Sequence, residues 1–199
     1  MRGSNFSSTS KEIKIASNLS PLRSKIFLES RSYIRQSLSN LFMIKPLDVP
    51  IHSEPGSPPI LPKNMGYVSM SHCKDACVIA WHKEKIGIDI ERIDRNFNYD
   101  VISKKYFFKK KNILKNSRIL KESILNKWCG VEAAIKWDRG NLLRDLEEWE
   151  YKKSDNHILH KSKKINLKIT QIIFLKWTIS IAIKNSNNES FEIIMCNNI

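Results

Sequence analysis

Three acids and one lysine in two short segments have the types and spacing for metal and phosphate chemistry. In the segment GIDIE, Asp89 and Glu91 are two residues apart, so on a strand both carboxylates leave the same face. In the segment WCGVEAAIK, Glu132 and Lys136 are one helical turn apart and share a face. Carboxylate oxygens are the ligands that hard cations such as Mg2+ prefer. The two segments together predict a metal site next to a basic side chain.

Each motif also has an ordinary structural explanation when it is taken alone. Polar and apolar residues alternate on many strands that have one wet face, where Asp89 and Glu91 would simply be solvated. Glu132 and Lys136 would form a surface ion pair that contributes about 0.3–0.5 kcal/mol to stability. The chemical interpretation therefore depends on finding both motifs in one chain.

The segments before residue 94 are expected to form one helix, a loop and three strands. Apolar residues recur at three- and four-residue steps over 22–43, which predicts an amphipathic helix. Residues 46–62 hold all but one of the seven prolines, which indicates a loop that crosses the surface. Three short apolar runs then predict a small antiparallel meander, at 67–71, 76–81 and 86–90.

The segments after residue 94 repeat this order. The longest helix is expected over 117–137, ending near Gly140, and strands are expected at 165–175, 178–183 and 191–195. The repeated order predicts an α+β protein with two pseudo-symmetric halves, each a helix packed on a small, mainly antiparallel sheet. We expect a flexible lead-in at 1–20, halves at 21–93 and 94–199, and the active site at their interface.

Charge is the most informative bulk property of the chain. Its 199 residues include 34 Lys and Arg against 20 Asp and Glu, which gives a formal net charge of +14. This excess favours an anionic partner, such as a phosphorylated cofactor, an acidic protein or a nucleic acid. A solvated basic surface would give the same total, so charge alone does not choose between these partners.

The remaining composition indicates a globular cytoplasmic protein. The chain is 41% hydrophobic, which is enough for a core, and its apolar runs stop well short of the roughly 20 residues that a membrane-spanning helix needs. The N-terminus lacks the pattern of a signal peptide. Cys73 and Cys77 lie beside His72, but no second pair of zinc ligands follows. The four cysteines are therefore expected to be free and mostly buried, at positions 73, 77, 129 and 196.

Taken together, the motifs resemble the 4′-phosphopantetheinyl transferase superfamily. Its signature is a G-[IV]-D-[IV]-E strand followed by W-x-x-[KR]-E-A-x-x-K on a helix, which is similar to 87–91 and 128–136 here. Residues 69–72, SMSH, look like the family's S-x-S-H segment, and 30–35 resemble its S-R-x-x-[LI]-R pattern. The match covers roughly residues 22–183 and looks like the longer, surfactin-synthetase-activating type in its cyanobacterial form, which is usually monomeric.

The resemblance implies a magnesium-dependent enzyme. It would transfer the 4′-phosphopantetheine group of coenzyme A to a serine of an apo acyl or peptidyl carrier protein and release adenosine 3′,5′-bisphosphate. Mg2+, or Mn2+ in its place, would be held by Asp89, Glu91 and Glu132. Glu132 and Lys136 would be the catalytic residues, with Lys136 on the pyrophosphate or the leaving group. The serine proton has three candidate acceptors, Glu132, a water on the metal and Lys136, of which Glu132 is preferred.

The resemblance also implies a binding site for coenzyme A, the substrate. Arg31 would serve its adenylate end, Ser71 and His72 would contact its phosphates, and Lys136 would meet the pyrophosphate. From the residues alone, a solvated helix arginine is an alternative for Arg31, and a histidine packed at a strand end is an alternative for His72.

The sequence departs from the family pattern at three places. Val131 stands where a basic residue is usual, Ser57-Pro58 stands where Lys-Pro is common, and Lys111 or Asn112 takes the place of a frequent acid. The first two changes remove cations expected near the coenzyme phosphates, so we expect either weaker binding of coenzyme A or replacement by nearby Lys and Arg. The expected metal ligands are intact.

The charge also suggests a macromolecular partner. A basic stretch with interleaved aromatic residues, 104–111, would suit the acidic surface of a carrier protein, although core aromatics flanked by solvated lysines explain it equally well. The alternative functions are a basic nucleic-acid-binding protein and a metal-dependent nuclease. The sequence contains no helix-turn-helix, zinc-finger or ribonucleoprotein motif, so we expect no nucleic acid as partner. The short apolar runs give no reason to expect a membrane either.

Overall fold

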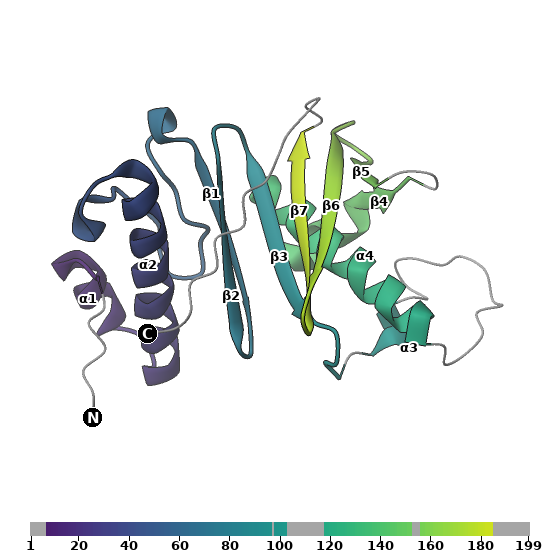
Figure 1. Ribbon diagram of the computed structural model, residues 1–199, viewed down its shortest axis with the longest axis horizontal. Coiled ribbons are helices and arrows are strands. Elements are labelled where there is room, and N and C mark those ends of the chain that lie inside the picture. Colours follow the sequence, from purple (N-terminus) through teal and green to yellow (C-terminus); the bar gives the residue numbers. More distant parts are fainter. Residues whose placement is uncertain (1–6, 97, 103–117, 153–155, 185–199) are drawn as a thin grey trace.

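A group of helices is followed by a group of strands twice along the chain in the computed structural model, which describes residues 7–96, 98–102, 118–152 and 156–184 (Figure 1). The helices are α1 (Ser10–Ala16), α2 (Pro21–Phe42), α3 (Tyr99–Ile102), α4 (Arg118–Trp137) and α5 (Leu142–Asp145), with short 3₁₀ helices η1 (Pro46–Asp48), η2 (Lys63–Met65) and η4 (Leu146–Glu148). The strands are β1 (Tyr67–Cys73), β2 (Ala76–His82), β3 (Ile86–Arg92), β4 (Trp149–Tyr151), β5 (His157–His160), β6 (Asn166–Phe174) and β7 (Trp177–Lys184). The predicted α+β class is confirmed.

The strands form two antiparallel sheets within the described ranges. β1 and β2 pair as a hairpin, and five strands pair in the order β3-β7-β6-β5-β4. In the β3–β7 ladder Asp89 lies opposite Ser180, and Glu91 lies opposite Thr178. This ladder crosses the boundary expected near residue 94, because β3 and β7 come from opposite sides of it.

The predicted meander is wrong at its third strand, although the strand positions agree with the prediction to within two residues. β3 pairs with β7 instead of extending the β1–β2 hairpin. Serine side chains of β1 link the two sheets, since Ile88 N–H donates to Ser69 Oγ at 3.1 Å and Ser71 Oγ donates to Asp89 Oδ1 at 2.7 Å. Ser69 thereby gives a hydrogen-bond partner to a buried backbone donor of β3.

Helix α4 crosses one face of the five-stranded sheet and packs closely on β3 (Figure 1). Gly87 permits this approach, because a Cβ at that position would lie against the Ala133 carbonyl oxygen and 2.6 Å from the Trp137 backbone nitrogen. Trp137 Nε1 also donates to the Lys85 carbonyl oxygen at 2.8 Å. The missing side chain of Gly87 therefore sets the distance between the strand and the helix that carry the two motifs.

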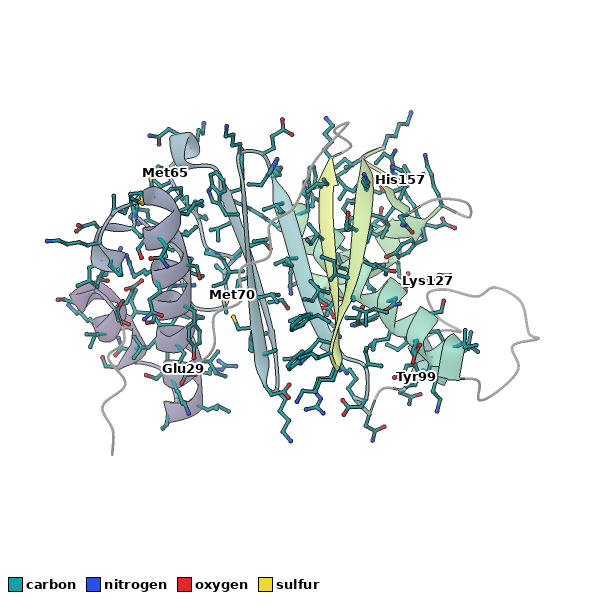
Figure 2. The ribbon with its side chains drawn as sticks, viewed as in Figure 1. Glu29, Met65, Met70, Tyr99, Lys127 and His157 are labelled. Carbon is teal, nitrogen blue, oxygen red and sulfur yellow. The ribbon has the colours of Figure 1, made fainter. Side chains whose placement is uncertain are left out.

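Helix α2 packs against the β1–β2 hairpin at the other end of the molecule (Figures 1 and 2). Its buried partners include residues of the proline-rich segment, so the predicted surface loop contributes to a core: Ile34, Leu38, Val49, Ile51, Leu61 and Val68. Met65 and Met70, both labelled in Figure 2, pack on the same core. Buried residues on both sides of the loop 55–59, Ile51 and Leu61, hold its two ends in this core.

The expected flexible lead-in at 1–20 contains helix α1, which is a difference from the prediction. Thr9 caps this helix, because its side chain accepts from Glu12 N–H while the Glu12 carboxylate accepts from Thr9 N–H. Glu12 then forms a buried ion pair with Arg35 of α2, with 3.0 Å between Oε1 and Nη2. The T-x-x-E pattern of a capping box was the sequence signal for α1, and it sits among Ser and Asn residues that resemble a tail.

Several predictions fall outside the described residues, namely the strand 191–195, the basic stretch 104–111 and Cys196. The other three cysteines are free, but only Cys129 is buried, so the prediction of mostly buried thiols is wrong for this part of the chain. Within the described ranges, no helix combines the length and apolar character needed to cross a membrane.

The close packing at Gly87 makes a testable prediction. In Gly87→Ala, the added methyl group must push α4 away from β3, and we expect a loss of unfolding free energy of about 1–3 kcal/mol in urea titrations. Divalent-cation binding should weaken as well. The control is Gly56→Ala, where an added Cβ meets nothing within 4 Å and only the backbone φ of +79° is unfavourable. Unchanged stability and cation binding in Gly87→Ala would contradict the packing argument.

A candidate metal centre in a charged cavity

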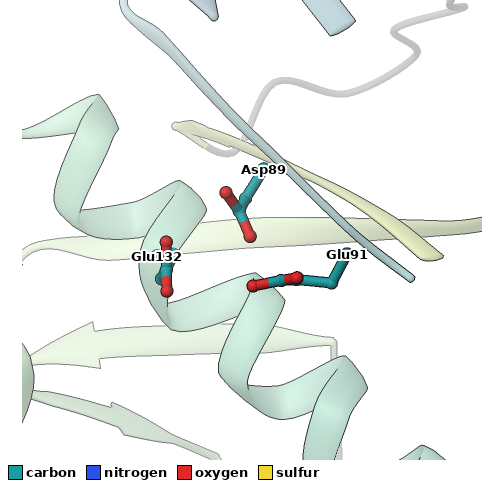
Figure 3. Close-up of side chains that lie close together, drawn as sticks. All are labelled: Asp89, Glu91 and Glu132. Atoms are coloured by element: carbon teal, nitrogen blue, oxygen red, sulfur yellow. The ribbon is translucent and has the colours of Figure 1, made fainter. Parts of the chain in front are cut away.

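The carboxylates of Asp89, Glu91 and Glu132 converge where β3 meets α4 (Figure 3). One oxygen from each residue lies within 4.8 Å of the other two. Asp89 and Glu91 project from β3 and Glu132 from α4, and Asp89 is only 2% exposed. The interpretation of a solvated strand is therefore wrong. Three converging oxygen donors are an arrangement that can hold a hard divalent cation.

Asp89 is held by two neighbours through one of its oxygens only. Lys136 Nζ donates to Asp89 Oδ1 at 2.6 Å and to Ser71 Oγ at 2.7 Å, while Ser71 Oγ donates to the same Asp89 oxygen at 2.7 Å. Asp89 Oδ2 is buried and has no hydrogen-bond partner in the described part of the chain. A buried carboxylate oxygen without a partner is costly. A cation at the centre of the three acids would satisfy it, so these residues fit the predicted metal.

Lys136 forms an ion pair with an acid on another element of the fold. Its ammonium group pairs with Asp89 on β3, so the interpretation of Glu132 and Lys136 as an isolated surface pair on one helix is wrong. Lys136 instead spans from α4 to β3 and reaches Ser71 on β1. Three elements are thereby joined around one buried carboxylate.

The same crowding perturbs the protonation of the two glutamates. Burial and the neighbouring Asp89 raise the pKa of Glu132 to about 8, against the opposing effect of Lys136. Burial also raises the pKa of Glu91, while its ion pair with Arg95 opposes that shift. Close acids resist ionising together, and a cation between them removes this resistance.

The three acids lie in the wall of a cavity of about 770 Å³. Helix α2, strand β1, the loop 55–59, strand β3 and helix α4 all contribute to its lining. Every site residue expected from the sequence is among the lining residues: Arg31, Ser71, His72, Asp89, Glu91, Glu132 and Lys136. The fold therefore brings the separate motifs to one cavity.

Arg31 is a buried cation without a carboxylate partner in the described residues. Arg31 is 5% exposed, and its guanidinium lies 4.8 Å from the centre of the Phe27 ring. Burial lowers the pKa of Arg31, an effect that Glu12 opposes and Arg35 reinforces, and Glu12 is itself paired with Arg35. The alternative of a solvated arginine is wrong. A buried unpaired guanidinium on a cavity wall is suited to an anionic ligand.

The other expected residues occupy different environments. His72 is exposed on β1, so the alternative of a packed histidine is wrong. Ser57 lines the cavity, whereas Val131 is 1% exposed and packs in the core under α4. A basic residue at position 131 would not lie on the cavity wall, so Val131 does not lower the charge of the cavity. Position 57 does lie on this wall.

Three basic residues line the cavity that the motifs did not identify, Arg23, Lys85 and Arg139. Arg23 is on α2, Lys85 directly precedes β3, and Arg139 is the second residue after the end of α4. No spacing rule singles them out, and in the sequence they were part of the general positive charge. The one sequence feature that could have pointed to Lys85 and Arg139 was their position close to the two motifs. Lys85 lies just before GIDIE, and Arg139 lies before Gly140.

The raised pKa of Glu132 makes a prediction about pH. Without a cation, the folded chain keeps a proton on Glu132 that the unfolded chain has released above about pH 4.5. The unfolding free energy should therefore fall as the pH rises from 4.5 towards 8, by at most about 1.4 kcal/mol per pH unit for this group.

Mg2+ should reverse the trend, because the cation favours the ionised carboxylate. We expect the increase in melting temperature on adding Mg2+ to be larger at pH 8.5 than at pH 6.5. Glu132→Gln should show a weaker pH dependence without metal and little increase with it. An equal Mg2+ effect at both pH values would contradict the assignment.

Comparison with known proteins supplies no family for this chain. No protein-family model matches the sequence, and no curated protein shows significant similarity to it. The functional interpretation therefore depends on the residues and their geometry.

Proposed function

We propose that this chain is a 4′-phosphopantetheinyl transferase. It would move the phosphopantetheine group of coenzyme A to the serine hydroxyl of an apo acyl or peptidyl carrier protein and release adenosine 3′,5′-bisphosphate. One observation carries the proposal: a three-carboxylate site lines the same cavity as Arg31, which is buried and has no carboxylate partner among the described residues. A pyrophosphate linked to a nucleotide needs both a cation and positive side chains.

The acid cluster supports the metal part of the proposal. Asp89, Glu91 and Glu132 would hold Mg2+ or Mn2+, whose charge would offset the negative charge that builds on the pyrophosphate oxygens. The buried Oδ2 of Asp89, which has no hydrogen-bond partner within the ranges that the structure describes, is the atom that this cation would satisfy. Lys136 and Ser71 keep the other oxygen of Asp89 in place and so orient the carboxylate.

The proton and the leaving group have candidate partners in the same cluster. Glu132 is the preferred acceptor of the serine proton, because its carboxylate lines the cavity beside the other two acids and would be kept ionised by the cation. Lys136 lines the cavity beside Asp89, where its ammonium group is suited to stabilise the leaving phosphate. Glu132 and Lys136 would fill these two roles from the same face of α4.

The rest of the cavity supports binding of coenzyme A. Arg31 would pair with an anionic group near the adenylate end, and its contact with Phe27 would keep it on the cavity wall. His72 is exposed on the wall and available to a phosphate. Ser71 is already bonded to Asp89 and Lys136, so we assign it the orientation of Asp89 in addition to any phosphate contact.

The finer description of the fold and of the partners belongs to the same proposal. We propose two pseudo-symmetric α+β halves, with Asp89 and Glu91 supplied by one and Glu132 by the other. The carrier would be acidic, the enzyme monomeric and cytoplasmic, and neither a nucleic acid nor a membrane would take part. The contribution of 104–111 to carrier binding lies outside the described residues.

Mass spectrometry of several acidic apo carrier proteins tests the function. After incubation with this chain, coenzyme A and Mg2+, one carrier should gain the mass of a single phosphopantetheine group. The gain should disappear with a chelator and fall by at least about a hundredfold in rate in Asp89→Asn, because the metal site is lost. Glu29→Gln, an acid on α2 outside the cluster, is the matched control.

Two results would count against the transferase. The first is an absence of mass gain with every carrier, although circular dichroism shows folded protein. The second is Mg2+-dependent cleavage of DNA that also requires Asp89, which would favour the metal-dependent nuclease instead.

A further inference from the structure

A second buried polar atom without a partner lies next to the metal centre. Ser180 of β7 is opposite Asp89 of β3 in the antiparallel ladder, and the side chains of such an opposed pair leave the same face of a sheet. Ser180 is 0% exposed, and its hydroxyl oxygen, like Asp89 Oδ2, has no hydrogen-bond partner among the described residues. A hydroxyl that can donate and a carboxylate oxygen that can accept are therefore both buried and both unsatisfied at neighbouring positions.

The polar groups around Ser180 already have other partners. Thr178, which also lies on β7 and is 0% exposed, donates its hydroxyl to Asn126 Oδ1 of α4 at 2.8 Å. The Cys129 thiol of α4 lies beside Ser180 and Asp89, but it is a weak hydrogen-bonding group and donates to the Thr178 carbonyl oxygen at 3.7 Å. On this part of β7, Ser180 is thus the residue whose hydroxyl the described fold leaves unused.

Packing gives no reason for a serine at position 180. A buried hydroxyl without a partner destabilises a fold relative to alanine at the same place. Alanine already packs between the sheet and the helix nearby, since Ala182 of β7 and Ala133 of α4 are both 0% exposed. The metal centre does give a reason, because carboxylates that bind a metal are usually hydrogen-bonded by a further group that fixes their orientation.

The distance across the ladder suits a hydrogen bond from Ser180 to Asp89. Opposed residues of antiparallel strands have Cβ atoms about 4.5–5.5 Å apart, a span that a hydroxyl and a carboxylate can bridge together. Asp89 Oδ1 already accepts from Lys136 and Ser71, so Oδ2 is the oxygen left for Ser180. Rotation of the two side chains about their own torsions brings these atoms together without a change in the backbone.

We propose that Ser180 is a positioning residue of the metal centre, whose hydroxyl donates to Asp89 Oδ2 when that oxygen binds the cation. This inference rests on the metal site of the proposed function and not on the transfer reaction. In the structure only Oδ1 anchors the carboxylate, so Oδ2 is not brought to the hydroxyl. A cation on Oδ2 would fix it, and the same oxygen keeps a lone pair for Ser180. Groups on β1, α4 and β7 would then orient both oxygens of one ligand.

The test compares Ser180→Ala with the unchanged chain in two measurements, Mn2+ affinity by electron paramagnetic resonance and melting temperature in the presence of a chelator. Ser180→Ala should bind Mn2+ about tenfold more weakly, which is the lower end of the effect of removing a partner of a metal ligand. Its melting temperature without metal should stay the same or rise, because a buried unsatisfied hydroxyl has been removed.

Thr178→Val is the matched control, since it removes a hydroxyl of equal burial from the same face of β7. It should behave in the opposite way. The melting temperature without metal should fall, because Asn126 Oδ1 loses its partner, while the Mn2+ affinity should stay within about twofold of the original. A purely structural role of Ser180 would make the two variants behave alike.

The role of Ser180 is wrong if Ser180→Ala binds Mn2+ within about twofold of the original chain. It is also wrong if Ser180→Ala melts as far below the original chain as Thr178→Val does, because the hydroxyl would then form a structural hydrogen bond without metal. If the original chain binds no Mn2+, the inference fails together with the metal site. A chain that shows the selective loss but modifies no carrier protein keeps Ser180 in this role and loses only the proposed reaction.

Discussion

The structure of the site depends on one constraint, the burial of the Asp89 carboxylate between a strand and a helix that touch. Gly87 allows α4 to lie on β3, and this contact brings Glu132 of the helix to Asp89 and Glu91 of the strand. A buried carboxylate needs compensation. Lys136 and Ser71 compensate one oxygen, and the other has no hydrogen-bond partner in the part of the chain described. The proposed cation would bind this second oxygen and so compensate its burial.

The distribution of charge around this centre gives the cavity a direction. The acids lie on β3 and α4, Lys85 precedes β3 and Arg139 follows α4, and Arg31 faces the cavity from α2. Electrostatics of this kind suits a ligand that carries a cation-bound pyrophosphate and further anionic groups. The net charge of +14 is therefore only partly a property of the outer surface, because several of the basic side chains line the cavity.

The local periodicity of the sequence predicted the two long helices and most strand positions well, because apolar spacing reports directly which face of an element is buried. Strand pairing could not be predicted in the same way. Nothing in the residues 86–92 indicates that β3 pairs with β7 rather than with β2, since pairing depends on packing between distant segments. Helix α1 was missed because its capping box at Thr9 and Glu12 lies in a stretch of tail-like composition.

The candidate site was more predictable than the fold around it. The spacing of Asp89 and Glu91 on a strand, and of Glu132 and Lys136 on a helix, follows from backbone geometry alone. Their meeting in one cavity required the three-dimensional arrangement, as did the burial of Arg31 and the position of Val131 in the core. Lys85 and Arg139 escaped the sequence analysis, because a lone basic residue next to a motif is indistinguishable from a solvated one.

The most direct measurement of the central claim is titration of the chain with Mn2+ followed by electron paramagnetic resonance, which detects free and bound metal separately. The account predicts one Mn2+ bound per chain and competition by Mg2+. Asp89→Asn and Glu132→Gln should each weaken binding by at least about tenfold, because each removes a charged oxygen ligand. Binding of Mn2+ with unchanged affinity and stoichiometry after both substitutions together would contradict a metal centre at these three carboxylates.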